Sequence, residues 1–386
     1  MSFTVETLQK EDLIHVISFG TRILWVCGLY HCKHLKKHFA YNFARILVIA
    51  LSLPFPCLII TGLVVSHSDL SGFLELGMFF LGSSWISIET TAQIYSLRQV
   101  AEIEEMLESD YDYFKPKTEL QCQFILAKRR RLVLITQIVW FCVYSFMIIF
   151  VLCPLVTNAS LVIPMWIPFG NKEFSAYLYQ SFYLLILCGI YTLLHNTFLG
   201  PILMATAQFQ ILKDNLIHAT DRSEDEDGFA QEKRIQERLK RCVKQHNAIL
   251  KLVSTVQGML APVFLGNISF TILGICFTVL QIILATDSGN FILLTSYLGI
   301  LILQMFLTCW VGNDLISETS DITQACYLSE WYNCTPSTKK MFLIIMSNTQ
   351  QPISLQSIIF PVSFGTFVMI LRSSYSYYTV FSQVYD

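Results

Sequence analysis

The apolar positions of this chain fall in long unbroken runs separated by charged segments. A bilayer core is about 30 Å thick, and about 20 consecutive apolar residues are needed to cross it as a helix. Helices are expected because a spanning segment must satisfy its own backbone hydrogen bonds in lipid. Six runs meet this length: 46–65, 73–97, 132–155, 177–209, 258–285 and 291–311.

A seventh apolar region begins at Met341 and is interrupted by SNTQQP at 347–352. Because proline disrupts the helical hydrogen-bond ladder, the sequence predicts a short helix, a break, and a span from Ile353 to about Val384. The predicted fold is an all-α membrane protein with seven transmembrane helices. Residues 1–311 would form a six-span domain, and residues 312–386 a cytosolic helix followed by the broken seventh span.

Lysine and arginine are distributed very unevenly between the two sides of the predicted spans. The segments up to residue 43 and at 98–131, 210–257 and 312–340 carry 5, 7, 9 and 2 of them. The segments on the other side carry only Lys172. Positive charge concentrates in cytosolic loops, so the N-terminus is expected in the cytosol and the C-terminus outside.

Two local features follow from this orientation. Asn158-Ala159-Ser160 lies in the longest outer loop and matches a glycosylation acceptor. Residues 13–30 are moderately apolar but contain His15 and Arg22. We therefore expect an interfacial or re-entrant helix there rather than an eighth span, which would invert the topology.

Residues 231–257 are charged, yet apolar residues recur there at four- and three-residue spacing, a heptad-like pattern with one polar interruption. No helix breaker separates this segment from the 258–285 span, so one helix of about 50 residues should project into the cytosol. The 177–209 span should have a similar extension. The stripe would pack against either that extension or partner helices. Its residues are Ile235, Leu239, Cys242, His246, Ile249, Val253 and Val256.

Composition supports the membrane prediction and excludes several other classes of protein. Hydrophobic residues make up 54% of the 386 residues and charged residues only 14%, whereas soluble domains have about 25% charged residues. The net charge of −2 gives no indication of nucleic-acid binding. The twelve cysteines show no metal-ligand spacing, and the common enzyme motifs are absent. We expect neither an enzyme nor a bound metal or cofactor.

Two ionisable residues lie inside predicted spans at similar depth. Glu89 is 16 residues from the start of the 73–97 span, and His195 is 18 residues from the start of the 177–209 span. Charged groups in a membrane are costly and usually face a partner or a polar cavity. The sequence allows either a Glu89–His195 contact or separate exposure of both to a wet cytosolic vestibule.

Polar residues form one stripe along the last span. At 100° per residue, Arg372, Ser376, Thr379 and Gln383 share a face, and Val380 and Val384 flank it. Such a stripe marks a helix–helix seam or the wall of a water path. Spacing alone favours the seam.

The last residues, SSYSYYTVFSQVYD, resemble the C-terminal signature of insect odorant receptors. Upstream, Tyr327, Trp331 and Tyr332 precede a basic pair, an apolar helix and a Gln-Pro break, as in that family. The related gustatory receptors end in Thr-Tyr, five mostly apolar residues and Gln-Phe. The ending here keeps that spacing but changes both ends, which favours the odorant branch.

This resemblance implies an odorant-gated, non-selective cation channel in the plasma membrane of olfactory sensory neurons, with no requirement for a G protein. Family members are tetramers around a pore lined by the last helix, and odour-tuning subunits assemble with a shared co-receptor. The co-receptor has a much longer second cytosolic loop than residues 210–257, so this chain resembles a tuning subunit. Matching Gln to Gln places the hydrophobic gate at Val380 and Val384. Arg372 would repel cations, so it is expected to face a neighbouring helix.

The resemblance also places an odorant pocket among the outer halves of four spans. Residues at that depth repeat at three- and four-residue spacing and combine aromatic rings with a few hydroxyls, which suits small volatile ligands. They are Leu76, Phe79, Phe80, Ser83, Tyr144, Met147, Ile148, Tyr179, Phe182, Tyr183, Ile186, Leu294, Tyr297 and Leu298.

Other functions fit the sequence less well. A G-protein-coupled receptor would have its N-terminus outside, and the DRY and NPxxY motifs are absent here. A gustatory-type channel is the main alternative, although its ending is not conserved in this chain. A secondary transporter would show internal repeats with paired broken helices, whereas only one broken helix is predicted.

Overall fold

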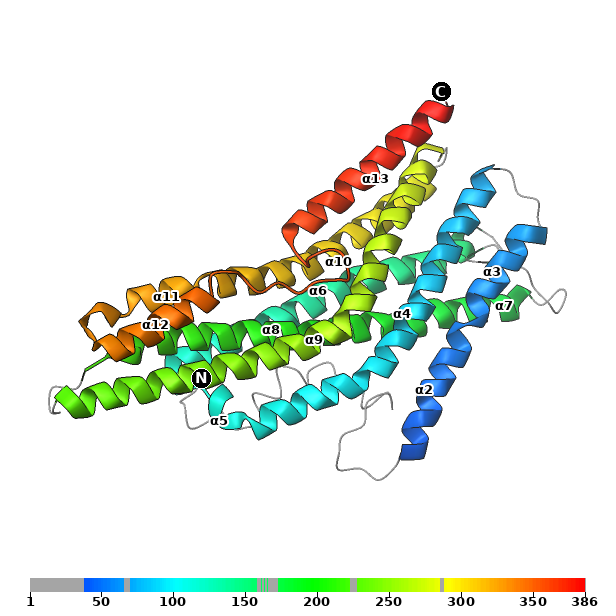
Figure 1. Cartoon of the computed structure of the whole chain (residues 1–386). Coiled ribbons are helices and arrows are strands. Elements are labelled where there is room, and N and C mark those ends of the chain that lie inside the picture. Colours follow the sequence, from blue (N-terminus) through cyan, green and yellow to red (C-terminus); the bar gives the residue numbers. More distant parts are fainter. Residues whose placement is uncertain are drawn as a thin grey trace.

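The computed structural model describes residues 38–65, 70–157, 161, 163, 165, 173–222, 228–284 and 288–385. Within these ranges the chain is almost wholly helical, as predicted, and the only β-type pairing is an isolated bridge between Gln356 and Pro361. The helices form one elongated bundle (Figure 1). Asn158, segment 13–30 and the acidic stretch 223–227 lie outside the described residues.

Helices occupy most of each predicted span. Their bounds are α2 (His38–Ser52), α3 (Pro54–Val65), α4 (Leu70–Ser109), α5 (Tyr111–Phe114), α6 (Glu119–Thr157), α7 (Glu173–Phe182), the π-helix η2 (Tyr183–Leu187), α8 (Cys188–Ile217), the 3-10 turn η3 (His218–Thr220), α9 (Gly228–Leu284), α10 (Ser288–Ser320), α11 (Ile322–Leu328), the 3-10 turn η4 (Trp331–Asn333), α12 (Pro336–Asn348) and α13 (Phe364–Tyr385).

Among the described residues, five helical stretches are long and apolar enough to cross a membrane. The stretches are Asn42–Val64, Glu119–Pro154, Phe174–Thr220, Gly228–Leu284 and Gly289–Asn333. α4 is helical over its predicted span and α13 over the later part of its own, but neither is among these five stretches. Serine, threonine and glutamine side chains dilute α4, and serine and tyrosine side chains dilute α13.

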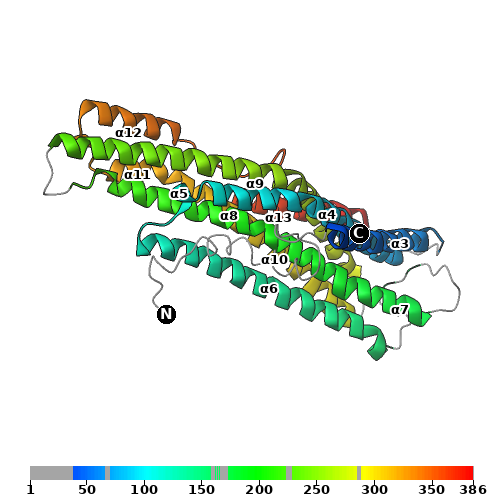
Figure 2. The same cartoon turned by 90° about the horizontal axis from the view of Figure 1, so that it is seen from below.

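α8 is the central helix of the bundle. It packs against α4, α6, α9, α10 and α11, and nearly all of its residues are buried. Figure 2 shows α8 enclosed between α6 on one side and α9 on the other. Because α8 contacts helices from both halves of the chain, a displacement of α8 would be transmitted to most of the bundle.

The predicted long helix is confirmed, and of the two packing alternatives for its stripe, the structure shows packing within the chain. α9 runs for 57 residues. Six stripe residues, Ile235, Leu239, Cys242, Ile249, Val253 and Val256, are buried in this chain. The His246 ring meets Phe209 of α8 edge-on, with ring centroids 6.2 Å apart. The stripe therefore covers the extension of the chain's own fourth span.

A buried ionic cluster joins the predicted cytosolic parts of α6, α8 and α10. Asp314 accepts hydrogen bonds from Lys128 at 2.6 Å and Arg131 at 2.7 Å. Glu318, one turn further along α10, lies 2.5 Å from Lys213 of α8. The Lys128 side chain is only 5% exposed. These basic side chains therefore connect α6 and α8 to α10.

The last span begins later than predicted. α12 ends at Asn348 and α13 begins only at Phe364, so a helix starting at Ile353 is wrong. Ser357 closes a turn with Phe360, because its hydroxyl donates to the Phe360 carbonyl and accepts from the Phe360 N–H, both at 2.8 Å. The following residue is Pro361, which disfavours helical geometry at Phe360.

The first predicted span is also interrupted, between α2 and α3. Pro54 and Pro56 have no N–H to donate to the carbonyls four residues earlier. The Ser87 hydroxyl on α4 donates instead to the Ser52 carbonyl, at 3.0 Å. This break allows α3 to follow α4 and places Phe55 inside the bundle.

Candidate functional site

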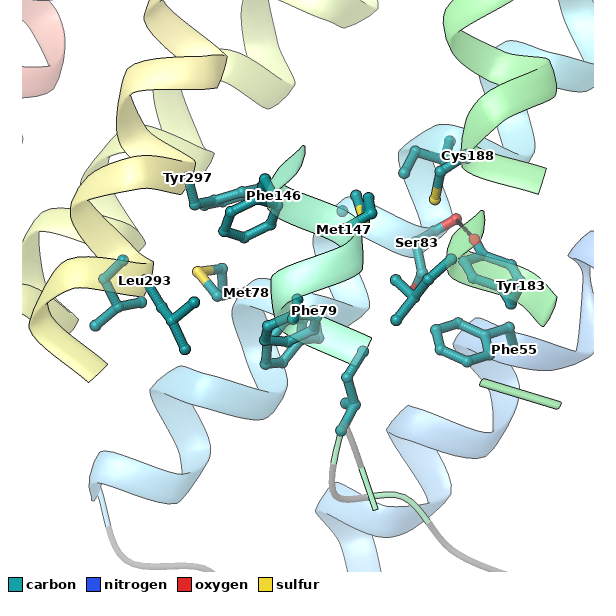
Figure 3. A pocket seen from close by; sticks show the side chains of 16 residues that line it. Phe55, Met78, Phe79, Ser83, Phe146, Met147, Tyr183, Cys188, Leu293 and Tyr297 are labelled. Atoms are coloured by element: carbon teal, nitrogen blue, oxygen red, sulfur yellow. Dashed lines mark hydrogen bonds between the residues drawn. The ribbon is translucent and has the colours of Figure 1, made fainter. Parts of the chain in front are cut away.

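A small apolar cavity lies between α3, α4, α6, η2 and α10. Its volume is about 90 Å³, several times the space that one water needs. Figure 3 shows aromatic rings, methionines and aliphatic side chains around it, with few polar atoms. Within the described residues, no group of three His, Cys, Asp or Glu side chains gathers closely enough to hold a metal ion.

Six of the fourteen predicted pocket residues line this cavity. α4 supplies Phe79 and Ser83, α6 supplies Met147, and η2 supplies Tyr183. The α10 helix supplies the other two, Leu294 and Tyr297. All six come from the four spans that the sequence indicated.

The other eight predicted residues do not line the cavity. Leu76 is buried beside it, and Phe80 and Tyr179 pack against the same hydrophobic cluster. Tyr144 stacks on Trp140, with ring centroids 4.9 Å apart, and Leu298 packs against the main core. The remaining three, Ile148, Phe182 and Ile186, are exposed on the outside of the chain.

Ten lining residues were not predicted. Most are neighbours of predicted positions on the same helices, and aromatic contacts such as Phe146 with Tyr297, at 6.0 Å between ring centroids, connect them to the predicted set. Phe55 and Ile163 come from outside the four spans. The ten are Phe55, Met78, Gly82, Ile86, Phe146, Phe150, Ile163, Leu184, Cys188 and Leu293.

Tyr183 is the most constrained residue of the cavity wall. Its ring stacks on Phe55 with centroids 3.8 Å apart and planes 9° apart. Its hydroxyl donates to the Ser83 backbone carbonyl at 3.2 Å (Figure 3). Tyr183 begins the π-helical turn η2, and such turns are frequent at functional sites. One side chain thus connects α3, α4 and η2.

The Glu89–His195 contact is confirmed. The His195 Nδ1 lies 3.0 Å from the Glu89 Oε1, and both side chains are buried. Gln93 donates to the same carboxylate oxygen at 2.7 Å. The other ring nitrogen, Nε2, lies 3.3 Å from the Thr308 hydroxyl. These residues join α4, α8 and α10 about one turn, two turns and three turns along the respective helices from the cavity.

The Thr308 hydroxyl is also within hydrogen-bond distance of the Gln304 carbonyl, at 3.0 Å. Glu89, His195 and Thr308 therefore form one hydrogen-bonded group across three helices, and buried polar groups of this kind are costly to leave without partners.

The described residues of the α13 polar stripe, Arg372, Ser376 and Thr379, lie on the side away from α9 and α10. Thr366, Ile370 and Ser374 are buried on the side that packs against α9 and α10. Arg372 and Ser376 are exposed on the opposite side, and Thr379 is half-buried. The side chains of Val380, Gln383 and Val384 lie outside the described residues.

The comparisons with known proteins agree on one family. The family described as "7tm Odorant receptor" matches residues 71–375. The chain belongs to the odorant receptor family. Odorant receptor 82a of Drosophila melanogaster is 24% identical over 232 residues, which cover 59% of this chain and 58% of that receptor. Odorant receptor 10 of Aedes albopictus is 23% identical over 201 residues, 52% of each chain. The matched stretches thus span about half the length of these relatives.

Solved structures support the fold of this odorant receptor. The olfactory receptor OR5 from Machilis hrabei matches with a TM-score of 0.82 and 15% identity, over 97% of this chain and 100% of that one. The same receptor in complex with eugenol matches with a TM-score of 0.81. At this identity the likeness concerns the fold alone.

Proposed function

We propose that this odorant receptor is the odour-tuning subunit of an odorant-gated, non-selective cation channel. The observation that carries the proposal is a small apolar cavity among helices from both halves of the chain, in a member of this family. Occupation of the cavity by a small volatile molecule would open a pore formed together with co-receptor subunits in a heterotetramer.

The cavity wall favours ligands that are mostly hydrocarbon. Ser83, Cys188 and Tyr297 are the polar groups at the wall beside Tyr183, and the Tyr183 hydroxyl already donates to the Ser83 carbonyl. A ligand with one hydroxyl, ester or phenol group would satisfy them, whereas a sugar would leave many groups without partners. The match to a receptor bound to eugenol supports this class of ligand.

The buried pair next to the cavity supplies a route from ligand to pore. Ile86, Cys188 and Tyr297 line the cavity, and the same three helices carry Glu89, His195 and Thr308. A ligand that spreads α4 from α8 would change this contact. Opening requires only that the ligand bind the open arrangement more tightly than the closed one.

α13 would supply this subunit's share of the pore. Its polar stripe is turned away from α9 and α10, so it is available to the path of ions or to a neighbouring subunit. Val380 and Val384 would form the gate, since apolar rings close a narrow pore by excluding water. Ser376, Thr379 and Gln383 would line the open path.

Seven membrane crossings complete the proposal. α4 and α13 would cross beside the five more apolar stretches, because their polar residues pack against other helices or face a pore. The distribution of lysine and arginine supports a cytosolic N-terminus and an extracellular C-terminus. Residues 1–311 would then hold the ligand site and residues 312–386 the cytosolic anchor and pore helix, in the plasma membrane of olfactory sensory neurons.

Patch-clamp recording with and without the co-receptor tests this function. Cells expressing both proteins should carry a cation current in response to members of a panel of volatile alcohols, esters, ketones and phenols. Current from this chain alone would contradict the tuning-subunit role. Responses confined to sugars would contradict an odorant ligand.

A further inference from the structure

The outer wall of the cavity comes from two segments outside the four spans that the sequence indicated. Phe55 lies in the first turn of α3, and Ile163 lies in the connection between α6 and α7. Each is only 1% exposed, and both line the cavity. Their side chains present only carbon and hydrogen.

Phe55 is held in place by two aromatic rings. It stacks on Tyr183 at 3.8 Å, and the Tyr179 ring lies at a tilt with its centroid 5.9 Å away. Tyr179 is itself tied to the end of α2, because its hydroxyl donates to the Leu51 carbonyl at 3.2 Å. Figure 3 shows the Phe55 ring beneath that of Tyr183. Phe55 cannot leave the cavity without breaking these contacts.

Ile163 is held by a side chain that does not line the cavity. Gln180 on α7 is fully buried. Its Nε2 donates to the Ile163 carbonyl at 2.6 Å, and its Oε1 accepts from the Ile163 N–H at 3.3 Å. Both backbone groups of one residue are thus paired with one amide, much as in a β-bridge. A buried amide and peptide are costly to leave unpaired, so these bonds fix Ile163 against the cavity.

We propose that Phe55 and Ile163 form the outer wall of the odorant site, and that Gln180 is the positioning residue that holds Ile163 there. This inference rests on the function proposed above. The first span and the connection between the third and fourth spans would then contribute to odour selectivity. The hydrocarbon end of a ligand lies against these two residues, and its polar end points across the cavity to Tyr297 (Figure 3).

Photolabelling of the full receptor, purified with its co-receptor, tests this arrangement. The probes are two hexanol derivatives, one with a diazirine at the hydrocarbon end and one with a diazirine beside the hydroxyl. The first should label Phe55 and Ile163, and the second Tyr297. Unlabelled hexanol at about ten times the probe concentration should reduce labelling roughly tenfold if both bind equally.

Gln180→Met tests the positioning role, because it keeps the side-chain length and removes both hydrogen bonds. Labelling of Ile163 should fall roughly tenfold or more, as expected from two lost bonds, while labelling of Phe55 persists. Ser181→Ala is the matched control, since it removes a hydrogen bond to Tyr177 on the same helix. If Gln180→Met does not fold, Ile163→Ala should increase the labelling of Phe55 by an octanol probe severalfold.

The outcomes separate this inference from the proposed function. Competable labelling of Met147 and Tyr297 with none on Phe55 or Ile163 would overturn the outer wall and leave the odorant site in place. Unchanged Ile163 labelling in Gln180→Met would overturn the positioning role, and unchanged Phe55 labelling in Ile163→Ala would overturn the place of Ile163 in the wall. Absence of competable labelling anywhere in the cavity would overturn the proposed function as well.

Discussion

Single buried polar residues hold neighbouring segments of the bundle in fixed positions. Gln180 holds one loop residue, and Tyr183 connects three elements. Each is buried and makes its hydrogen bonds to the backbone of another segment. Because an unpaired buried polar group is costly, such residues select one arrangement among many apolar packings of similar energy.

His246 should make the stability of the cytosolic helices depend on pH. Burial against α8 lowers the pKa of His246 from its ordinary value of 6.5. The unfolded chain therefore takes up a proton more readily than the folded one, so the stability is present above about pH 6.5 and is lost as the pH falls. Thermal unfolding of purified receptor should show a smaller loss between about pH 7.5 and pH 5.5 for His246→Gln than for the wild type.

Asn247→Gln is the control for this measurement, because Asn247 is exposed beside His246 and its side chain does not titrate. That variant should keep the full pH dependence of the wild type. Equal pH dependence in His246→Gln and the wild type would show that the histidine is not responsible.

Individual pocket residues were only partly predictable from the sequence. On a soluble helix the apolar face marks the core, but a helix in lipid is apolar on every side. Phe174, Leu178, Phe182 and Ile186 repeat every four residues and are all exposed in this chain. Hydrophobicity therefore could not separate Phe182 from the buried Tyr183 beside it. Phe55 had one local signal, its position between two prolines.

At the scale of elements, the helices were predictable because length and apolar content are strong signals, and the breaks were less so. The Gln-Pro break was visible, but the turn at 357–360 depends on a serine that also occurs inside helices. The Glu89–His195 contact was one of two possibilities, and the structure selects it because α4 and α8 pack directly. That contact should set the register of the two helices.

Replacing only one member of the Glu89–His195 pair should destabilise the protein more than replacing both. Glu89→Met or His195→Phe alone leaves one buried polar partner, at a cost of about 3–5 kcal/mol. The double variant removes both and should recover much of that loss. Thermal unfolding and surface labelling of the three variants measure this, and Ile88→Met, at a position 59% exposed, is the control. Strictly additive losses would mean that the two side chains do not interact.

Gly312 should be required for the contact between α10 and the turn that precedes α13. A Cβ at this position would lie 2.5 Å from the Val362 Cγ1, inside van der Waals contact. Gly312→Ala should therefore destabilise the protein by about 1–3 kcal/mol, the usual cost of overpacking. A Cβ at Gly299, on the same helix, would have no neighbour within 4 Å. Gly299→Ala should therefore have little effect on stability. Similar melting curves for both variants would contradict the close packing.

At the scale of the whole molecule, orientation is the first property to test. An odd number of crossings with lysine and arginine on the cytosolic side places the C-terminus outside. An epitope attached after Asp386 should be stained on intact cells, and one attached before Met1 only after permeabilisation. The reverse staining pattern would mean that the orientation is inverted and that the proposed gate does not lie near the extracellular face.

Under the proposed function, the apolar cavity must be mechanically coupled to the pore helix α13. The cavity lies between α3, α4, α6, η2 and α10, whereas α13 contacts α9 and α10. α10 is thus the helix that both lines the cavity and contacts α13, the proposed pore helix. Under the proposed function, a ligand that displaces α10 would act directly on α13.

The most direct test is the odorant dose–response curve of a cavity-filling variant, recorded by patch clamp with the co-receptor. Ser83→Leu places a larger apolar side chain into the cavity, and Ser84→Leu, which does not line it, is the matched control. Ser83→Leu should shift the curve for the best agonist of the panel by about ten- to hundredfold toward higher concentration, equivalent to about 1–3 kcal/mol of binding. The maximal current and surface expression should be close to those of the control. Superimposable curves for Ser83→Leu and Ser84→Leu would contradict the claim that odorants open the channel from this cavity.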